Sequence, residues 1–172
     1  MLSTNQKGAI AETAIALEAL KAGVEVYRPA FEGGRYDLIL AHDHRLLRVQ
    51  CKWARRKADV VMIGCYSCRR TRSGLATRAY TSAEVDVIAA YCLDTEACYL
   101  VPPEVFEATP RIQLRLARAK NGQRRRINWA DEFDFAARLR EHFPGAIAQL
   151  GERQSGTLEV AGSSPAGSIE SA

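Results

Sequence analysis

Hydrophobic residues recur at helical spacing near the start of the chain. Ile10, Ala14 and Leu17 follow the three- and four-residue steps that place side chains on one face of a helix. Small polar residues at positions 3–5 can cap such a helix, and a glycine directly after Ala22 can end it. The pattern therefore predicts a helix over residues 8–22.

Alternating or mostly apolar runs that end at turn residues predict the strands of a sheet. A short strand is expected at 24–28. The apolar-rich runs 36–41 and 45–53 are separated by only a few polar residues, so they are expected to form an antiparallel hairpin. Further strands are expected at 60–63, 97–101 and 112–116.

The remaining segments are expected to be one loop and two helices. Residues 68–78 are basic, lack periodicity and contain a glycine, so they are interpreted as a mobile loop. Thr81 or Ser82 can cap a helix running to about Cys92, and residues 129–143 form a second amphipathic pattern. This order of elements predicts an α/β fold with a central mixed sheet.

Composition predicts one folded domain and a tail. The chain has 172 residues, of which 47% are hydrophobic and 26% charged, and this suits a single compact domain. We place that domain at 1–144, followed by a disordered tail at 145–172 that is rich in glycine, serine and alanine. The sequence shows neither a signal peptide nor a membrane span, so a cytoplasmic protein with reduced cysteines is expected.

Positive charge is concentrated in three clusters, although the net charge is only +4. Such clusters can neutralise the phosphates of a DNA duplex, whereas any one of them alone is also typical of a solvated surface. The candidate DNA-binding residues are Arg55, Arg56 and Lys57 in the first cluster, Arg69, Arg70, Arg72 and Arg78 in the second, and Arg118, Lys120, Arg124, Arg125 and Arg126 in the third.

The expected hairpin brings three polar side chains together. Asp37 stands near the start of its first strand and Gln50 near the end of its second, so antiparallel pairing places them side by side at one end of the sheet. Lys52 is two residues beyond Gln50 and therefore points to the same face. One acid, one amide and one amine converge.

This set of groups suits a hard divalent cation. Mg²⁺ prefers oxygen ligands and needs only one or two carboxylates from a protein. Asp37 is the expected primary ligand, and the Gln50 side-chain oxygen and the Cys51 carbonyl can complete the protein's share. Lys52 can orient the attacking water or stabilise charge on the phosphate, and Glu12, on an alanine-lined helix stripe, can reach a metal-bound water.

Each of these residues also has an ordinary interpretation. Asp37 can cap the turn before it, Gln50 can be a plain strand residue, Lys52 a surface base and Glu12 a solvent-facing helix residue. Their occurrence together and in this order is what favours a catalytic site.

Three short segments in this order resemble a known family. KGAIAE at 7–12, YDLIL at 36–40 and RVQCK at 48–52 look like the compact PD-(D/E)XK nucleases. They are most similar to the homing endonucleases encoded in group I introns, and next to the archaeal Holliday junction resolvases. The resemblance continues more loosely to about residue 105.

The resemblance implies a fold and a role for four residues. It implies a restriction-endonuclease-like core and a Mg²⁺-dependent endonuclease, with the helix acid at Glu12, the metal-binding acid at Asp37, the second metal-side residue at Gln50 and the catalytic lysine at Lys52. Tyr36 replaces the proline of the family motif, and Gln50 replaces its second acid. Loss of that acid should weaken metal binding, although glutamine occurs there in some active relatives.

The tail carries a second resemblance. The segments AQLGER at 148–153 and GSSP at 162–165 are similar to translations of the D-arm and T-arm of a transfer-RNA gene, and their separation matches the distance between those arms. An unremarkable linker is the alternative. Our hypothesis is that the reading frame runs into a transfer-RNA gene, as expected for a mobile element beside its target.

Together these observations predict a metal-dependent endonuclease that acts on double-stranded DNA, most simply of the homing type. A junction resolvase with a branched substrate and an inactive DNA-binding module are the alternatives. An enzyme of this size must meet both strands of its substrate, so a homodimer or homotetramer is expected.

Overall fold

The computed structural model describes residues 1–31, 33–117 and 127–145. Its first element is helix α1 (Thr4–Lys21), which begins four residues before the predicted start. Ser3 caps it, because the Ser3 hydroxyl accepts from the Gln6 backbone N–H at 3.2 Å while the Gln6 side chain accepts from the Ser3 N–H at 2.8 Å. The predicted helix is confirmed, and its start is set by a capping box.

The buried face of α1 differs from the predicted one. Ala11, Ile15 and Ala19 are buried, whereas Leu17 is 50% exposed. The alanines are small enough to bring the helix axis close to the sheet, so the narrow alanine stripe faces the core and the larger leucine faces outward.

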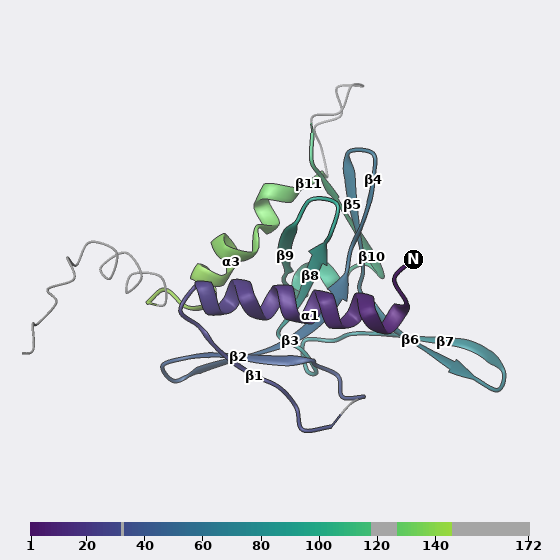
Figure 1. Cartoon of the computed structure of the whole chain (residues 1–172), viewed down its shortest axis with the longest axis horizontal. Helices are drawn as coiled ribbons and strands as arrows, with labels where there is room; N and C mark the ends of the chain where they lie inside the picture. Colours follow the sequence, from purple (N-terminus) through teal and green to yellow (C-terminus); the bar gives the residue numbers. More distant parts are fainter. Residues whose placement is uncertain (32, 118–126, 146–172) are drawn as a thin grey trace, which may run out of the picture.

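A five-stranded mixed sheet forms the centre of the fold and confirms the predicted α/β class (Figure 1). Its strands lie in the order β1-β2-β3-β8-β9, with β3 and β8 parallel and all other neighbours antiparallel. The strands are β1 (Glu25–Tyr27), β2 (Leu38–His42), β3 (Arg45–Trp53), β8 (Val87–Cys92) and β9 (Ala97–Val101).

A second sheet packs beside the first in the order β11-β10-β5-β4. The predicted strands at 60–63 and 112–116 are confirmed within it, whereas the short β4 and β11 were not expected. Its strands are β4 (Arg55–Lys57), β5 (Val60–Gly64), β10 (Arg111–Arg115) and β11 (Asn128–Trp129).

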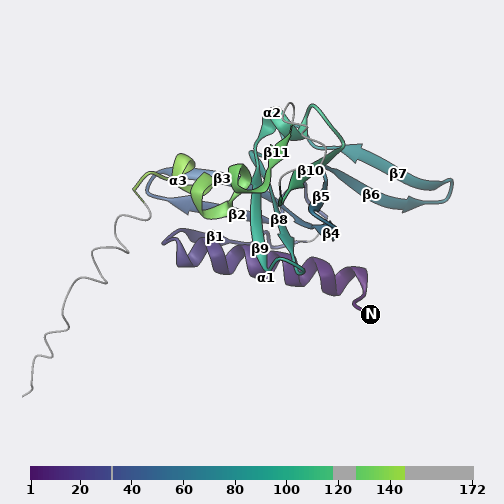
Figure 2. The ribbon, with the colours of Figure 1, turned by 90° about the horizontal axis from the view of Figure 1, so that it is seen from above.

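Two hydrophobic clusters cover the two faces of the central sheet, and helix α1 lies along one of these faces (Figure 2). On one face, Ile15 of α1 packs with Val49 and Val87. On the other, Ile88 packs with residues of the second sheet and with Phe106 of the short helix α2 (Pro103–Phe106). Strand β8 is therefore buried from both sides, and the parallel strand β3 beside it buries Leu47, Val49 and Cys51 in the cluster that includes α1.

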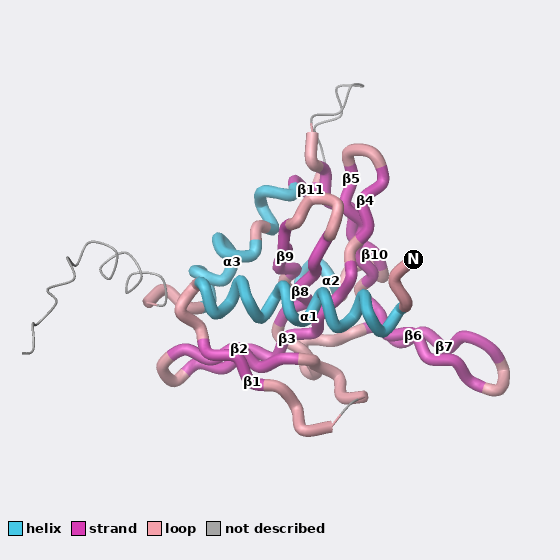
Figure 3. The backbone as a smooth tube through the Cα atoms, viewed as in Figure 1, coloured by secondary structure: helices cyan, strands magenta, loops and turns pink. Residues whose placement is uncertain are grey.

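The basic segment 68–78, predicted to be a mobile loop, forms a hairpin instead. Strands β6 (Tyr66–Thr71) and β7 (Gly74–Ala79) pair antiparallel through six residue pairs. Nearly all of their side chains are exposed, so the segment lacks the apolar alternation that identifies a strand in sequence. The hairpin projects away from the rest of the molecule (Figure 3).

The helix predicted from Thr81 or Ser82 to Cys92 is also wrong. A single turn remains, in which the Glu84 and Val85 N–H groups donate to the Thr81 carbonyl. The chain then enters β8, in which five of six residues are buried. A strand covered on both faces is continuously apolar, and such a run can match a helical pattern by chance.

The C-terminal helix is confirmed in part. A 3₁₀ turn η1 (Ala130–Phe133) comes first, and helix α3 (Phe135–His142) follows it. Asp134 caps α3 by accepting from the Ala137 N–H at 2.9 Å, so the predicted single helix is interrupted at this cap. The predicted tail lies outside the described residues from position 146 onward.

No helix in the described parts of the chain is both long and apolar enough to cross a membrane.

Candidate active site

Asp37 lies where the β2–β3 hairpin begins. Its backbone N–H donates to the Val49 carbonyl at 2.9 Å, which places Asp37 beside Gln50 as the antiparallel register requires. One carboxylate oxygen, Oδ2, accepts from the Cys51 N–H at 2.8 Å and from the Gln50 side-chain amide. The structure therefore brings these three residues together at one end of the sheet.

Gln50 is the one buried polar or charged residue among those described, at 6% exposure. Its Nε2 contacts Asp37 Oδ2 and also lies 3.2 Å from the Cys51 carbonyl oxygen. The amide thus stands between two oxygens that were predicted to bind a metal ion. Turning the amide by half a turn would present Oε1 there in place of Nε2, and three oxygens would then converge on one point.

Lys52 faces the same side of β3 as Gln50. Its Nζ donates to the Tyr80 hydroxyl at 2.9 Å. Burial lowers the pKa of Lys52, while the negative charge of Asp37 acts in the opposite direction. The ammonium group is therefore held in a partly dry pocket beside the acid.

Glu12 lies near this group of residues but is paired elsewhere. Its carboxylate forms an ion pair of 2.8 Å with Arg28, and both side chains are partly exposed. The negative charge of Glu12 is close enough to contribute to the raised pKa of Asp37. Glu12 therefore lies within electrostatic reach of Asp37, with Arg28 as its present partner.

The balance of charge around Asp37 is unfavourable to its ionised form. Burial is the largest cause and raises the pKa of Asp37, and the Cys51 N–H acts against it. Glu12 raises this pKa further, whereas Lys52 and Gln50 lower it. Burial and the nearby Glu12 thus disfavour the ionised form of Asp37. A cation bound beside the carboxylate would stabilise that form.

An open cleft of about 670 Å³ reaches the two acids. It lies between the first half of α1 and the segment from Arg28 to Asp37, and Glu12, Arg28 and Asp37 all line it. Solvent can therefore reach the acids from this side.

The donor set fits a hard cation such as Mg²⁺. Within residues 1–31, 33–117 and 127–145, no group of three or more histidine, cysteine, aspartate or glutamate side chains is placed to hold a metal. The available oxygens are the Asp37 carboxylate, the Gln50 side chain and the Cys51 carbonyl, with Glu12 nearby. A cation that takes one or two carboxylates and keeps several waters is the kind this set can hold.

The predicted DNA-binding residues are divided between the edge strand β4, the β6–β7 hairpin and a segment outside the described residues. Arg55, Arg56 and Lys57 are all exposed on β4. The second cluster lies on the β6–β7 hairpin, where all four arginines are exposed. The third set, Arg118, Lys120, Arg124, Arg125 and Arg126, lies outside the described residues.

Two arginines of the β6–β7 hairpin are tied to the body of the protein. Arg69 donates to the Gly33 carbonyl at 3.0 Å, and Arg78 pairs with Glu84. Arg70, near the tip, and Arg72, in the turn, extend beyond these contacts. The base of the hairpin is therefore anchored, and its tip presents free positive charge.

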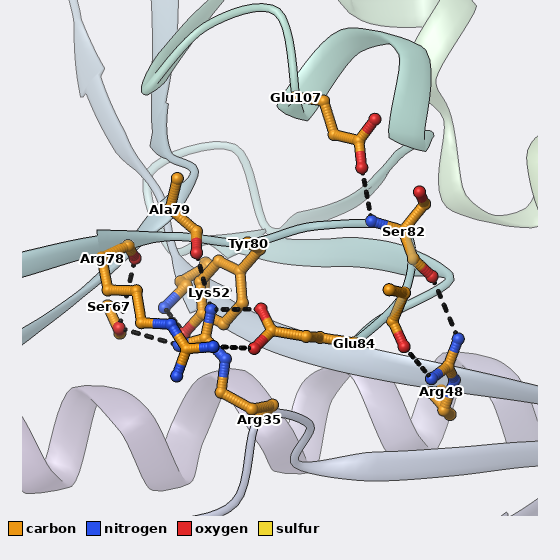
Figure 4. Close-up of polar contacts among 11 residues, drawn as sticks. Arg35, Arg48, Lys52, Ser67, Arg78, Ala79, Tyr80, Ser82, Glu84 and Glu107 are labelled. Carbon is orange, nitrogen blue, oxygen red and sulfur yellow. Dashed lines mark hydrogen bonds and ion pairs between the residues drawn. The ribbon is translucent and has the colours of Figure 1, made fainter.

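Sequence reasoning missed the residues that surround Lys52, shown in Figure 4. Arg35 donates to the Ser67 hydroxyl at 3.0 Å, to the Ala79 carbonyl at 2.7 Å and to Glu84 at 2.7 Å. Its guanidinium carbon lies 4.2 Å from the centre of the Tyr80 ring. These partners are separated by 30 to 50 positions along the chain, so no local pattern could have indicated them.

Comparisons with known proteins agree with this geometry. The sequence matches the model of the PD-(D/E)XK endonuclease family over residues 2–136. The fold is similar to the structure of a bacterial homing endonuclease, I-Ssp6803I, with a TM-score of 0.65 and 27% sequence identity over 91% of this chain and 100% of that one. A search among curated proteins gives no match. The chain belongs to the PD-(D/E)XK endonuclease family.

Proposed function

We propose that this chain is a divalent-metal-dependent endonuclease that cuts double-stranded DNA and that Mg²⁺ is its cofactor. The observation that carries the proposal is the convergence of Asp37, Gln50 and the Cys51 carbonyl at the end of the β2–β3 hairpin, with Lys52 on the same face. An acid, two neutral oxygens and an amine in this arrangement suit hydrolysis of a phosphodiester.

Each residue has a distinct role in the proposed reaction. Asp37 is the primary metal ligand, and the Gln50 side chain and Cys51 carbonyl supply neutral oxygens. The bound ion would supply Lewis acidity at the scissile phosphate. Lys52 presents its ammonium group to the charge that develops on the phosphate oxygens. Glu12, once released from Arg28, can accept a hydrogen bond from water in the cleft.

The β6–β7 hairpin is the proposed DNA-binding arm. A two-stranded ribbon has the dimensions to enter the major groove, and this one is exposed on both faces. Arginine side chains at its tip can contact phosphates or guanine edges. Arg55, Arg56 and Lys57 on β4, and the third cluster at 118–126, are proposed to extend the phosphate contacts.

The homing type is the finer part of the proposal. It is supported by the similarity to I-Ssp6803I, which is described as a bacterial homing endonuclease, and by the transfer-RNA-like segments of the tail. Reading the nucleotide sequence for a cloverleaf over residues 148–165 tests the second support. If no cloverleaf is present, the tail gives no reason to favour a mobile element.

The proposal also covers the domain boundaries, the oligomeric state and the cellular location of the protein. We place the nuclease domain at 1–144 and a separate tail at 145–172, and we expect a homodimer or homotetramer because both DNA strands must be cut. The five cysteines are free thiols in the structure, four of them buried, and this favours the reducing cytoplasm as the place of action.

The test is cleavage of DNA by the purified protein with Mg²⁺. The substrates are supercoiled plasmid, a four-way junction, and linear DNA in which the sequences flanking the gene are joined without it. A specific double-strand break in the joined flanks is the expected result. Cutting of the junction alone would favour the resolvase, and binding without cutting of any substrate would favour the inactive DNA-binding module.

A further inference from the structure

Tyr80 contacts the predicted catalytic lysine directly. The residue lies in the segment between β7 and β8, is 3% exposed, and accepts a hydrogen bond at 2.9 Å from Lys52 Nζ. The same nitrogen lies 4.6 Å from the centre of the Tyr80 ring. Among the described residues, Tyr80 is the one hydrogen-bond partner of the Lys52 ammonium group.

We propose that Tyr80 is a positioning residue for DNA cleavage, whose hydroxyl holds the Lys52 ammonium group at the reacting phosphate. This inference rests on the proposed function, because it assigns no purpose to Tyr80 unless Lys52 takes part in cleavage. Tyr80 itself touches no reacting atom, and it acts through Lys52.

A lysine needs such a partner because its side chain is long and flexible. Four rotatable bonds separate its backbone from its charge, and fixing them costs conformational entropy. Burial raises the pKa of Tyr80 to about 12, so the hydroxyl keeps its proton and presents a neutral oxygen to the ammonium group. The contact therefore fixes Lys52 without neutralising its charge.

Tyr80 is itself held in place from two directions. Arg35 lies against the face of its ring at 4.2 Å and donates at 2.7 Å to the carbonyl of the preceding residue, Ala79. The same guanidinium pairs with Glu84 at 2.7 Å, on the far side of Tyr80 in the chain (Figure 4). One arginine thereby contacts the Tyr80 ring, the backbone carbonyl before it and the Glu84 side chain after it.

The arrangement also links Lys52 to the DNA-binding arm. Arg35 donates to the Ser67 hydroxyl on β6, and Glu84 pairs with Arg78 on β7. The base of the hairpin and the position of the lysine are therefore set by the same small group of side chains. A partner at Lys52 other than Tyr80 would lack this connection.

Tyr80→Phe tests the proposal because it removes the hydroxyl and keeps the ring against Arg35. Tyr99→Phe is the matched control, since Tyr99 is also a buried tyrosine and its hydroxyl lies 3.2 Å from Thr95. Under single-turnover conditions with Mg²⁺, Tyr80→Phe should cut about ten-fold more slowly, as expected for loss of one hydrogen bond to a charged group. The dissociation constant for DNA should stay within about two-fold of the wild type, and Tyr99→Phe should cut at the wild-type rate.

A second measurement needs no cleavage. In ¹⁵N-labelled protein without metal or DNA, an ordered lysine ammonium group gives a ¹⁵Nζ–¹H signal because its exchange with water is slow. The Lys52 signal, identified by its loss in Lys52→Met, should disappear in Tyr80→Phe and persist in Tyr99→Phe. If it is unchanged in Tyr80→Phe, the hydroxyl does not order the lysine and the proposal is wrong.

The two measurements separate the possible failures. If the wild type cuts and Tyr80→Phe cuts equally fast, Tyr80 has no positioning role although the proposed function stands. If Tyr80→Phe loses cleavage and DNA affinity together, its role is structural and the inference is overturned. If the wild type cuts no DNA while the Lys52 signal still depends on Tyr80, the contact between the two side chains exists. In that case the proposed function is wrong, and the inference that rests on it is wrong as well.

Discussion

The β2–β3 and β6–β7 hairpins are both antiparallel, yet they differ in nearly every other respect. In the first, Leu38, Leu40 and Val49 are fully buried between α1 and the central sheet. In the second, no residue is buried. The first carries the acid, amide and amine of the candidate active site, whereas the second carries arginines.

The difference places the candidate catalytic side chains on buried strands and the arginines of the proposed DNA-binding arm on an exposed hairpin. Groups that must meet within about half an ångström are placed on strands that the hydrophobic core holds in position. Groups that contact phosphates along a duplex need reach and charge more than fixed positions, and an exposed ribbon supplies both. The comparison predicts that the two hairpins can be disabled independently.

The largest effect is expected from Asp37→Asn. Loss of the proposed primary metal ligand should remove several kcal/mol of charge stabilisation, so the single-turnover rate of DNA cleavage should fall by roughly a thousand-fold or more. DNA affinity should change little. Asp43→Asn is the control, because this aspartate is exposed in the β2–β3 turn at a φ of 52°, where asparagine is well tolerated. An Asp37→Asn protein that still cuts would refute the site.

The next effect is expected along the β6–β7 hairpin, from its anchored Arg69 to Arg70 and Arg72 near the tip. Replacing Arg69, Arg70 and Arg72 with glutamine should weaken DNA binding by about a hundred-fold near 0.1 M salt and reduce the slope of log affinity against log salt by about 2 to 3. The cleavage rate at saturating protein should stay near that of the wild type. Arg140→Gln, on the exposed side of α3, should change neither quantity. Unaltered binding by the triple variant would exclude the hairpin as the DNA-binding arm.

A smaller effect is expected where β3 meets β8. The Asp86 carboxylate accepts from the Arg48 N–H at 2.7 Å and from its guanidinium at 2.7 Å and 3.1 Å. Burial alone would raise the pKa of Asp86, but these hydrogen bonds outweigh burial and lower it. The pair therefore stabilises the fold above the pKa of an unfolded aspartate, about 4, and this contribution is lost as the pH falls through the lower folded value.

Asp86→Asn should accordingly lower the free energy of unfolding by about 1 to 2 kcal/mol at pH 7, a value that allows for solvent screening of this partly exposed pair. The difference from the wild type, measured by urea denaturation, should shrink towards zero below about pH 3. Asp94→Asn, in an exposed turn, is the control. A difference that stays constant with pH would contradict the ionic explanation.

The smallest effect is expected at Arg28. Its ion pair with Glu12 is partly exposed, so Arg28→Gln should change the free energy of unfolding by less than about 1 kcal/mol. The variant leaves Glu12 without its counter-charge, and the Mg²⁺ concentration for half-maximal cleavage should fall by a few-fold. An increase in the Mg²⁺ requirement would mean that Arg28 supports the site and does not compete with the metal for Glu12.

The sequence predicted the β2–β3 hairpin and the meeting of Asp37 with Gln50 because both depend on local register. A short turn fixes which residues face each other, and alternation fixes the face of Lys52. The course of the chain after the hairpin was harder to predict. β8 is buried on both faces and gave no alternation, and the exposed β6–β7 hairpin gave no apolar signal.

The surroundings of Lys52 were beyond sequence reasoning for a different reason. Tyr80 contacts Lys52 across 28 positions of the chain, and Arg35 contacts the Tyr80 ring and the Ala79 carbonyl beside it. Neither residue forms part of a spaced motif, and their contacts depend on tertiary packing alone. For the same reason the pairing of Glu12 with Arg28 had no signal in the sequence.

The most direct test of the account measures binding and cleavage on one and the same DNA. Asp37→Asn and the triple hairpin variant are compared with the wild type, using a target with a mapped cleavage site and Mg²⁺. The account predicts opposite defects: Asp37→Asn binds normally and does not cut, and the hairpin variant binds weakly and cuts at the normal rate once saturated. Two variants with the same defect in both measurements would contradict the separation of catalysis from DNA binding.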